Sequence, residues 1–197
     1  MNEDFTDPIY CYDGTDTLIN NFNIKDSKSL KKIERTLTSA RLIQLYKNPL
    51  NLNYDVKHLK AIHHFIFQDI YPWAGKFRRV DISKGALFCH AAYIEDQIHK
   101  LFLKLKKDNY LKGLAFDDLV IKVSYYLSEI NAIHPFRDGN GRAQREFVRE
   151  LLIPLNYHVD YSKIEPDFML KASIDSFNGN NDLMNKLFIK CIVPKSF

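Results

Sequence analysis

The chain has 197 residues, of which 46% are hydrophobic, enough to bury the core of one domain and too many for a disordered chain. Its 28 basic residues outnumber its 24 acidic ones, a mild excess that suits an anionic ligand but lacks the basic stripe of duplex-binding proteins. The three widely spaced cysteines form no CxxC pair, which argues against a disulfide framework and favours a reduced, cytoplasmic compartment. No apolar run resembles a signal peptide or a membrane span, while delivery by a specialised secretion route stays open.

Helical spacing marks the first two elements of the chain. Apolar residues recur at steps of three and four between residues 27 and 46, which predicts a helix with one buried face that ends at Asn48-Pro49. A second helix is capped by Asp55 and ends before Pro72. We expect residues 1–26 to form an extension packed on or near the core of a single domain that spans residues 1–197. The two apolar faces consist of Leu30, Ile33, Leu37, Ala40 and Ile43 in the first helix and of Leu59, Ile62, Ile66 and Phe67 in the second.

A hairpin then interrupts the helical pattern between residues 76 and 90. Strand-forming residues lead into the turn residues Ser83-Lys84-Gly85, after which residues 86–88 can return along the first strand. Helical spacing resumes over residues 94–105, 119–133 and 147–155, and two shorter helical pieces follow Glu165-Pro166. The helix that ends at Ile133 is expected to be the central one.

A short loop between two of these helices concentrates charged side chains. Residues 134–145 read HPFRDGNGRAQR, with one imidazole, one carboxylate, two glycines, an asparagine and three arginines. Gly139 and Gly141 permit backbone angles that other residues avoid, so successive N–H groups can converge on an anion before a helix that begins near Arg142. The helix N-terminus adds about half a positive charge, and Arg142 and Arg145 lie one turn apart, where both can contribute to the same anion. The loop therefore predicts a site for a polyphosphate.

Two further side chains of this loop can supply chemistry. Asp138 offers a hard oxygen ligand, and Mg²⁺ commonly uses one or two carboxylates together with phosphate oxygens and water. His134 follows a helix end, and an imidazole with an ordinary pKa of about 6.5 can accept a proton from an attacking hydroxyl. Each piece alone would indicate only a helix stop or a turn. The combination, with arginines on the next helix, favours a catalytic site.

The string HPFRDGNGRAQR resembles the signature of the Fic family, HxFx(D/E)GNGRxxR, and fills every fixed position. Trp73-Ala74-Gly75 followed by Arg78 is similar to the segment that enters the hairpin flap of this family, and residues 179–188 are similar to its C-terminal helix. Residues 10–18, YCYDGTDTL, are similar to the N-terminal YxYxGTxxL stretch of members that adenylylate proteins. The likeness runs from about residue 10 to residue 188 and is strongest in the loop.

The resemblance implies an all-α fold, a Fic-type helical bundle with one small β-hairpin flap. It implies an enzyme that uses Mg²⁺ and ATP to transfer AMP to a Tyr, Thr or Ser hydroxyl of a target protein. The flap, at about residues 80–88, would hold the target segment by strand addition. By position in the signature, the roles are general base for His134, metal ligand for Asp138, phosphate cradle for Asn140 with the Gly139 and Gly141 backbone, and phosphate binding for Arg142 and Arg145.

Three other functions stay open at this point. A Fic relative that phosphorylates proteins would resemble GNKR in the loop, whereas this chain has glycine at position 141. A non-catalytic nucleotide-binding or protein-binding module would need neither His134 nor Asp138, and a nucleic-acid binder would need more basic charge. His58, His63 and His64 lack the spacing of a zinc site, and we expect solvated or partly buried structural roles for them.

Control of the enzyme is expected to come from outside the chain. Fic proteins are often restrained by a helix that bears (S/T)xxxE(G/N), whose glutamate pairs with the last arginine of the signature, here Arg145. No glutamate of this chain is followed by glycine or asparagine. The resemblance therefore implies that a separate, small antitoxin-like protein supplies the glutamate to Arg145, as in toxin–antitoxin pairs. An unrestrained enzyme, a divergent inhibitory segment and control by oligomerisation are the alternatives.

Overall fold

The computed structural model describes residue 7, residues 9–50 and residues 52–195. These residues are mainly helical, with single 3₁₀ turns at Ala91–Tyr93, Asn109–Leu111, Ile153–Leu155 and Tyr161–Lys163. The helices are α1 (Ser27–Lys47), α2 (Val56–Phe67), α3 (Ile94–Lys107), α4 (Phe116–Ile133), α5 (Asn140–Leu152), α6 (Pro166–Phe177) and α7 (Asp182–Cys191). The strands are β1 (Ser83–Lys84), β2 (Ala86–Leu87), β3 (Tyr157–Val159) and β4 (Ile192–Pro194). The predicted all-α fold with a small hairpin is confirmed.

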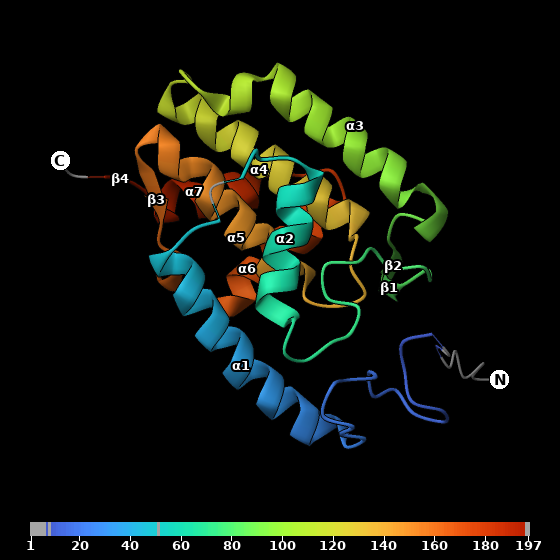
Figure 1. Ribbon diagram of the computed structural model, residues 1–197. Helices are drawn as coiled ribbons and strands as arrows, with labels where there is room; N and C mark the ends of the chain where they lie inside the picture. The colour runs from blue at the N-terminus through green and yellow to red at the C-terminus, as the bar shows by residue number, and fades with distance from the viewer. Residues whose placement is uncertain (1–6, 8, 51, 196–197) are drawn as a thin grey trace.

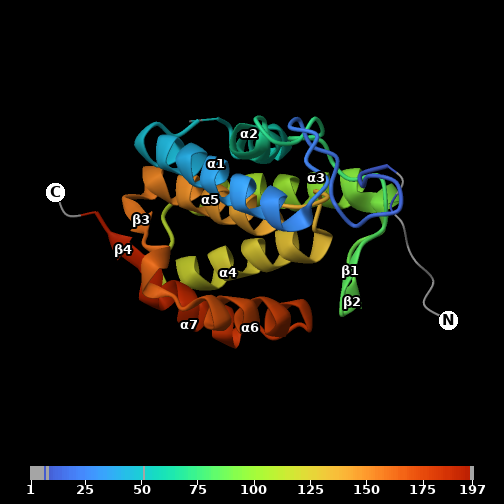
Figure 2. The ribbon, with the colours of Figure 1, turned by 90° about the horizontal axis from the view of Figure 1, so that it is seen from below.

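Helix α4 lies at the centre of the bundle, as its apolar pattern predicted. It packs against α3, α5, α6 and α7 (Figure 1). Figure 2 shows α1 and α2 on one side of α5, and α6 and α7 on the far side of α4. The loop that joins α4 to α5 is thus held between two layers of helices. None of the described helices combines the length and the apolarity needed to cross a membrane.

The buried face of α1 differs from the predicted one. Asp26 caps the helix through a hydrogen bond from the Ser29 N–H, and the helix ends at Lys47 as expected. Ile43, however, is 58% exposed, whereas Thr38 is buried. The prediction holds for Leu30, which is buried, and for Leu37, which packs against the core, but not for Ile43. Thr38 is turned inward instead, because it and Glu34 bind Arg142 of the signature loop.

The predicted hairpin exists, but its strands are only two residues long. Ser83 pairs with Leu87 around Gly85, whose φ of +78° is the left-handed conformation that favours glycine. Both strands are exposed on their two faces. The strand-forming residues before the turn do not extend the ladder, since Phe77 and Val80 pack against the core instead.

Two features join distant parts of the chain. Strands β3 and β4 form a second antiparallel sheet, which the sequence pattern did not predict because its two strands lie far apart in the chain. The segment before α1 packs on the core through buried Tyr10 and Leu18, and the Asn21 N–H donates to the Ile70 carbonyl over 2.8 Å. The Arg79 N–H donates to the Tyr10 hydroxyl, which brings this segment to the base of the hairpin.

Candidate active site

A cavity of about 960 Å³ lies between the signature loop, the hairpin and α6. Every site residue chosen from the sequence lines this cavity. The loop contributes His134, Asp138, Gly139, Asn140, Gly141, Arg142 and Arg145, the hairpin contributes Lys84, Gly85, Ala86 and Phe88, and α6 contributes Met169, Leu170, Ile174 and Phe177.

His134 is held in the form that a general base requires. It caps the C-terminus of α4 in a left-handed conformation with φ of +48°. Its Nδ1 lies 3.1 Å from the carbonyl oxygen of Asn131, which can only accept, so Nδ1 carries the hydrogen and Nε2 keeps a free lone pair. Burial lowers the pKa of His134 to about 4, and the ring stacks on Phe88 with centroids 3.9 Å apart. The imidazole is therefore neutral at pH 7 and ready to accept a proton at Nε2.

Asp138 brings one half-buried carboxylate to the cavity. Its Oδ1 accepts a hydrogen bond from the Gly139 N–H, which leaves Oδ2 for another partner. Among the described residues, no group of three or more His, Cys, Asp or Glu side chains could enclose a metal ion. A site with one carboxylate fits Mg²⁺, which takes most of its ligands from phosphates and water, and does not fit a structural zinc ion.

The glycine loop forms the N-terminus of α5, which begins at Asn140, two residues earlier than expected. Gly139 has a φ of +79°, as its predicted conformational freedom requires. The Asn140 side chain faces inward, where Oδ1 accepts from the Phe136 N–H and Nδ2 donates to the Phe136 carbonyl, both over 2.8 Å. Among the described residues, neither the Asn140 N–H nor the Gly141 N–H donates a hydrogen bond. Two donors at a helix N-terminus are thus free for an anion.

The prediction that Gly141 adopts unusual backbone angles is wrong, because this residue is part of helix α5. Glycine matters at position 141 because it leaves room for the Arg145 side chain. A Cβ atom at Gly141 would lie 3.1 Å from Nη1 of Arg145. The missing side chain therefore lets the Arg145 guanidinium lie against the first turn of the helix.

The two signature arginines on α5, Arg142 and Arg145, have different partners. The Arg142 guanidinium donates to Glu34 over 2.7 Å and to the Thr38 hydroxyl over 3.2 Å, both on α1. The Arg145 guanidinium has no carboxylate partner among the described residues, and burial lowers its pKa. Arg145 therefore brings to the cavity a guanidinium that has no ion pair among the described residues, while Arg142 also ties α5 to α1. Glu34 carried no recognisable sequence signal, since its partner is 108 residues away.

His63 of α2 binds the backbone of the signature loop, a contact that the sequence did not indicate. Its Nδ1 accepts from the Gly75 N–H and its Nε2 donates to the Asp138 carbonyl, each over 2.9 Å. The ring is stacked between Phe136 and Phe67, and burial lowers its pKa to about 3. The structural role expected for the histidines of α2 is right for His63, although the residue is completely buried rather than partly so.

Comparisons with known proteins place this arrangement in one family. The chain is 37% identical over 187 residues to protein adenylyltransferase VbhT of Bartonella schoenbuchensis, which covers 94% of this chain but only 38% of VbhT. It is 39% identical over 176 residues to the probable protein adenylyltransferase y4lH of Sinorhizobium fredii, covering 88% of this chain and 90% of that protein.

A solved structure shares the whole architecture. The BepC protein, a VirB-translocated effector of Bartonella tribocorum solved with bound AMPPNP, superposes with a TM-score of 0.88 at 28% identity. The likeness covers 95% of this chain and 98% of that one. The model of the Fic/DOC family matches residues 53–152, a range that includes α2, the hairpin, α4 and the signature loop. The resemblance seen in the sequence is thereby confirmed, and this chain belongs to the Fic/DOC family.

Proposed function

We propose that this chain is a protein adenylyltransferase that transfers AMP from ATP to a Tyr, Thr or Ser hydroxyl of a target protein. The observation that carries the proposal is the pairing of a neutral His134, whose Nε2 is free, with an anion site at the N-terminus of α5. A base and a phosphate site facing one cavity suit the attack of a hydroxyl on phosphorus. The names of the relatives agree with this reaction.

In the proposed reaction, different residues of the site accept the proton and hold the phosphates. His134 accepts the proton of the target hydroxyl at Nε2 as the hydroxyl oxygen bonds to the α-phosphorus of ATP. The bond between the α-phosphorus and the oxygen that bridges to the β-phosphorus breaks, and pyrophosphate leaves. The free N–H groups of Asn140 and Gly141 and the Arg145 guanidinium hold the negative phosphates. Arg142 contributes its charge to the same site while it remains paired with Glu34.

Mg²⁺ is the metal that the site suits, with Asp138 as its protein ligand and phosphate oxygens and water as the others. Bound there, it would neutralise phosphate charge. Two contacts hold Asp138 in place: the Gly139 N–H donates to its carboxylate, and the His63 imidazole of α2 donates to its backbone carbonyl.

The hairpin is the proposed docking site for the target protein. Strands β1 and β2 pair only with each other among the described residues, and both are exposed. A target segment can add to such an edge through main-chain hydrogen bonds, which places its hydroxyl near the cavity without selecting a particular side chain. This mode of binding leaves the identity of the target to contacts outside the edge itself.

The rival reaction is phosphorylation, and labelled ATP separates the two. Incubation of a cell lysate with α-³²P-ATP should label a protein only when the chain is added, whereas addition of the chain should give no new label from γ-³²P-ATP, and EDTA should prevent the chain-dependent label. New chain-dependent label from the γ position alone would identify a kinase. Absence of label from both, with ATP bound in a filter assay, would identify a non-catalytic module. Any side chain at position 141 would bring a Cβ atom to 3.1 Å from Nη1 of Arg145, so the guanidinium would have to shift slightly to make room.

Arg145 is also the proposed target of an inhibitor. Its guanidinium lines the cavity without a carboxylate partner among the described residues, and a bidentate carboxylate would hold it firmly. We expect a small antitoxin-like protein to supply a glutamate there and to co-purify with the chain from its host. The glutamate-to-glycine variant of that partner should still bind but should no longer inhibit. A pull-down without a small partner, with the isolated chain weakly active, would contradict this expectation.

A further inference from the structure

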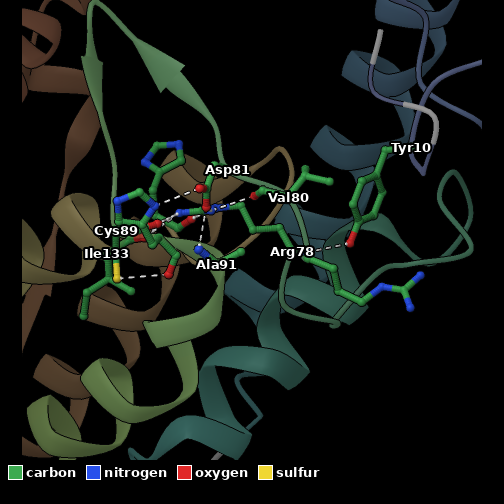
Figure 3. Close-up of polar contacts among 10 residues, drawn as sticks. Tyr10, Arg78, Val80, Asp81, Cys89, Ala91 and Ile133 are labelled. Carbon is green, nitrogen blue, oxygen red and sulfur yellow. Dashed lines mark hydrogen bonds and ion pairs between the residues drawn. The ribbon is translucent and has the colours of Figure 1, made fainter. Parts of the chain in front are cut away.

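Arg78 lies at the base of the hairpin and is almost completely buried, with 2% of its surface exposed. Figure 3 shows its guanidinium among main-chain carbonyl groups, with the Asp81 carboxylate beside it. Nε donates to the His134 carbonyl and Nη1 to the Val80 carbonyl, each over 2.8 Å. Nη2 donates to the Cys89 carbonyl and, over 3.2 Å, to the Ile133 carbonyl.

These four carbonyls come from three parts of the active site. Val80 precedes β1 and Cys89 follows β2, so one guanidinium binds both legs of the hairpin. Ile133 and His134 form the C-terminus of α4, so the same group also binds the residue proposed as the base. The backbone strengthens this link, because the Arg78 N–H donates to the Pro135 carbonyl over 2.9 Å.

Asp81, on the solvent-exposed side of the hairpin, links the segment before β1 to the segment after β2. Its Oδ1 accepts from the Ala91 N–H over 2.7 Å and its Oδ2 lies 2.8 Å from Nδ1 of His90 (Figure 3). The nearest approach of this carboxylate to the Arg78 guanidinium is 3.9 Å. Two side chains therefore link the segments before β1 and after β2. The buried Arg78 guanidinium binds the Val80 and Cys89 carbonyls, and the half-exposed Asp81 carboxylate binds His90 and Ala91.

The physical chemistry of this position requires arginine. A buried guanidinium without a hydrogen-bonded carboxylate is costly unless its donors are satisfied, and here the carbonyls satisfy them. Two of these carbonyls end a helix, where the macrodipole favours a cation. Lysine has the same charge but a single point of donation, which cannot span both legs of the hairpin and α4 together.

We propose that Arg78 is a positioning residue that fixes the hairpin relative to His134. The inference rests on the proposed function, because it gives the hairpin the task of presenting a target hydroxyl to the base. A target strand held on β1 or β2 reaches Nε2 of His134 in the correct geometry only if the hairpin and the end of α4 move as one body. The hydrogen bonds of Arg78 to both elements hold the hairpin and the end of α4 in a fixed relative position.

The test is Arg78→Lys in the full chain, with Arg79→Lys as the matched control at the exposed neighbouring position. Hydrogen–deuterium exchange should become faster in peptides from residues 80–90 of Arg78→Lys, on the order of tenfold, and stay unchanged in those from α2 and α5. The kcat for AMP transfer should fall on the order of 10²-fold, with the Kd for ATP unchanged. Arg79→Lys should match the wild type in all three measurements.

Asp81→Ala is the second variant, since its half-exposed side chain can be removed without burying a charge. It should accelerate exchange in the same peptides. Unchanged local exchange in both variants, or uniform acceleration across the whole chain, would overturn the proposal. The exchange measurement needs no substrate, so a wild-type chain that transfers no AMP would refute the proposed function and still leave the positioning role of Arg78 open to test.

Discussion

Replacing His134 with alanine should lower AMP transfer by about 10²- to 10⁴-fold, because a positioned base typically contributes that much. ATP binding should persist, since the proposed phosphate donors lie on α5 and not on His134. His134 itself has a φ of +48°, a left-handed conformation that histidine adopts more often than alanine does, so the alanine variant adds some backbone strain. His134→Asn is therefore the companion variant, because asparagine tolerates the left-handed conformation. Label transfer from α-³²P-ATP and ATP titration measure the two effects separately.

His99→Ala supplies the control for this prediction, since His99 is an exposed histidine on α3. The pH profile adds a second criterion. Because burial lowers the pKa of His134 to about 4, the base is unprotonated throughout the neutral range. The kcat/KM should stay flat with respect to this group from about pH 6 to pH 8 and fall only near pH 4, where Nε2 becomes protonated. Activity within threefold of wild type in both His134 variants would reject His134 as the base.

The placement of the site residues in one cavity could be predicted from the sequence because these residues are close together in the chain. His134, Asp138 and Gly139 lie within one loop, and the helices on either side of it have apolar patterns that fix their type and approximate ends. The hairpin and the central place of α4 followed from the same patterns. Local sequence thus determined which residues meet the cavity.

The supports of the site could not be predicted, because they come from distant parts of the chain. Glu34 binds Arg142 across 108 residues, His63 binds the Asp138 carbonyl across 75, and Arg78 reaches the end of α4 across 55 or 56. Periodicity reports which face of an element is apolar, and it carries no information about which polar group on another element will face it. This explains why the apolar pattern placed Ile43 on the buried face of α1 and missed Glu34 and Thr38, which bind Arg142 of α5.

Gly139→Ala should damage the anion site more than any other single methyl group in the loop. The added Cβ would lie 2.2 Å from Cζ and 2.3 Å from Cε2 of Phe67, distances at which some atom must move. The Phe67 ring has little room to yield, since His63 stacks against it with centroids 4.6 Å apart and the Arg142 guanidinium lies 4.6 Å from its centroid. The loop itself must therefore shift, which displaces the free N–H groups of Asn140 and Gly141.

Gly113→Ala is the matched control, because Gly113 has the same φ of +79° with no atom within 4 Å of the added Cβ. It isolates the backbone strain of about 1–2 kcal/mol. Gly139→Ala adds overpacking that typically costs about 1–3 kcal/mol more, so its unfolding free energy should fall by about 2–5 kcal/mol. Its ATP affinity should fall as well, whereas Gly113→Ala should bind ATP normally.

The Gly139→Ala/Phe67→Leu double variant tests the cause of this damage. Leucine removes the ring atoms that the new methyl group would strike, so ATP affinity should recover in part and the two substitutions should couple by about 0.5–3 kcal/mol in denaturant unfolding. Equal stability and equal ATP binding in Gly139→Ala and Gly113→Ala would contradict the steric argument. Additive effects in the double variant would show that the damage does not come from the contact between the new methyl group and Phe67, and would leave the strain at the positive φ of Gly139 as its cause.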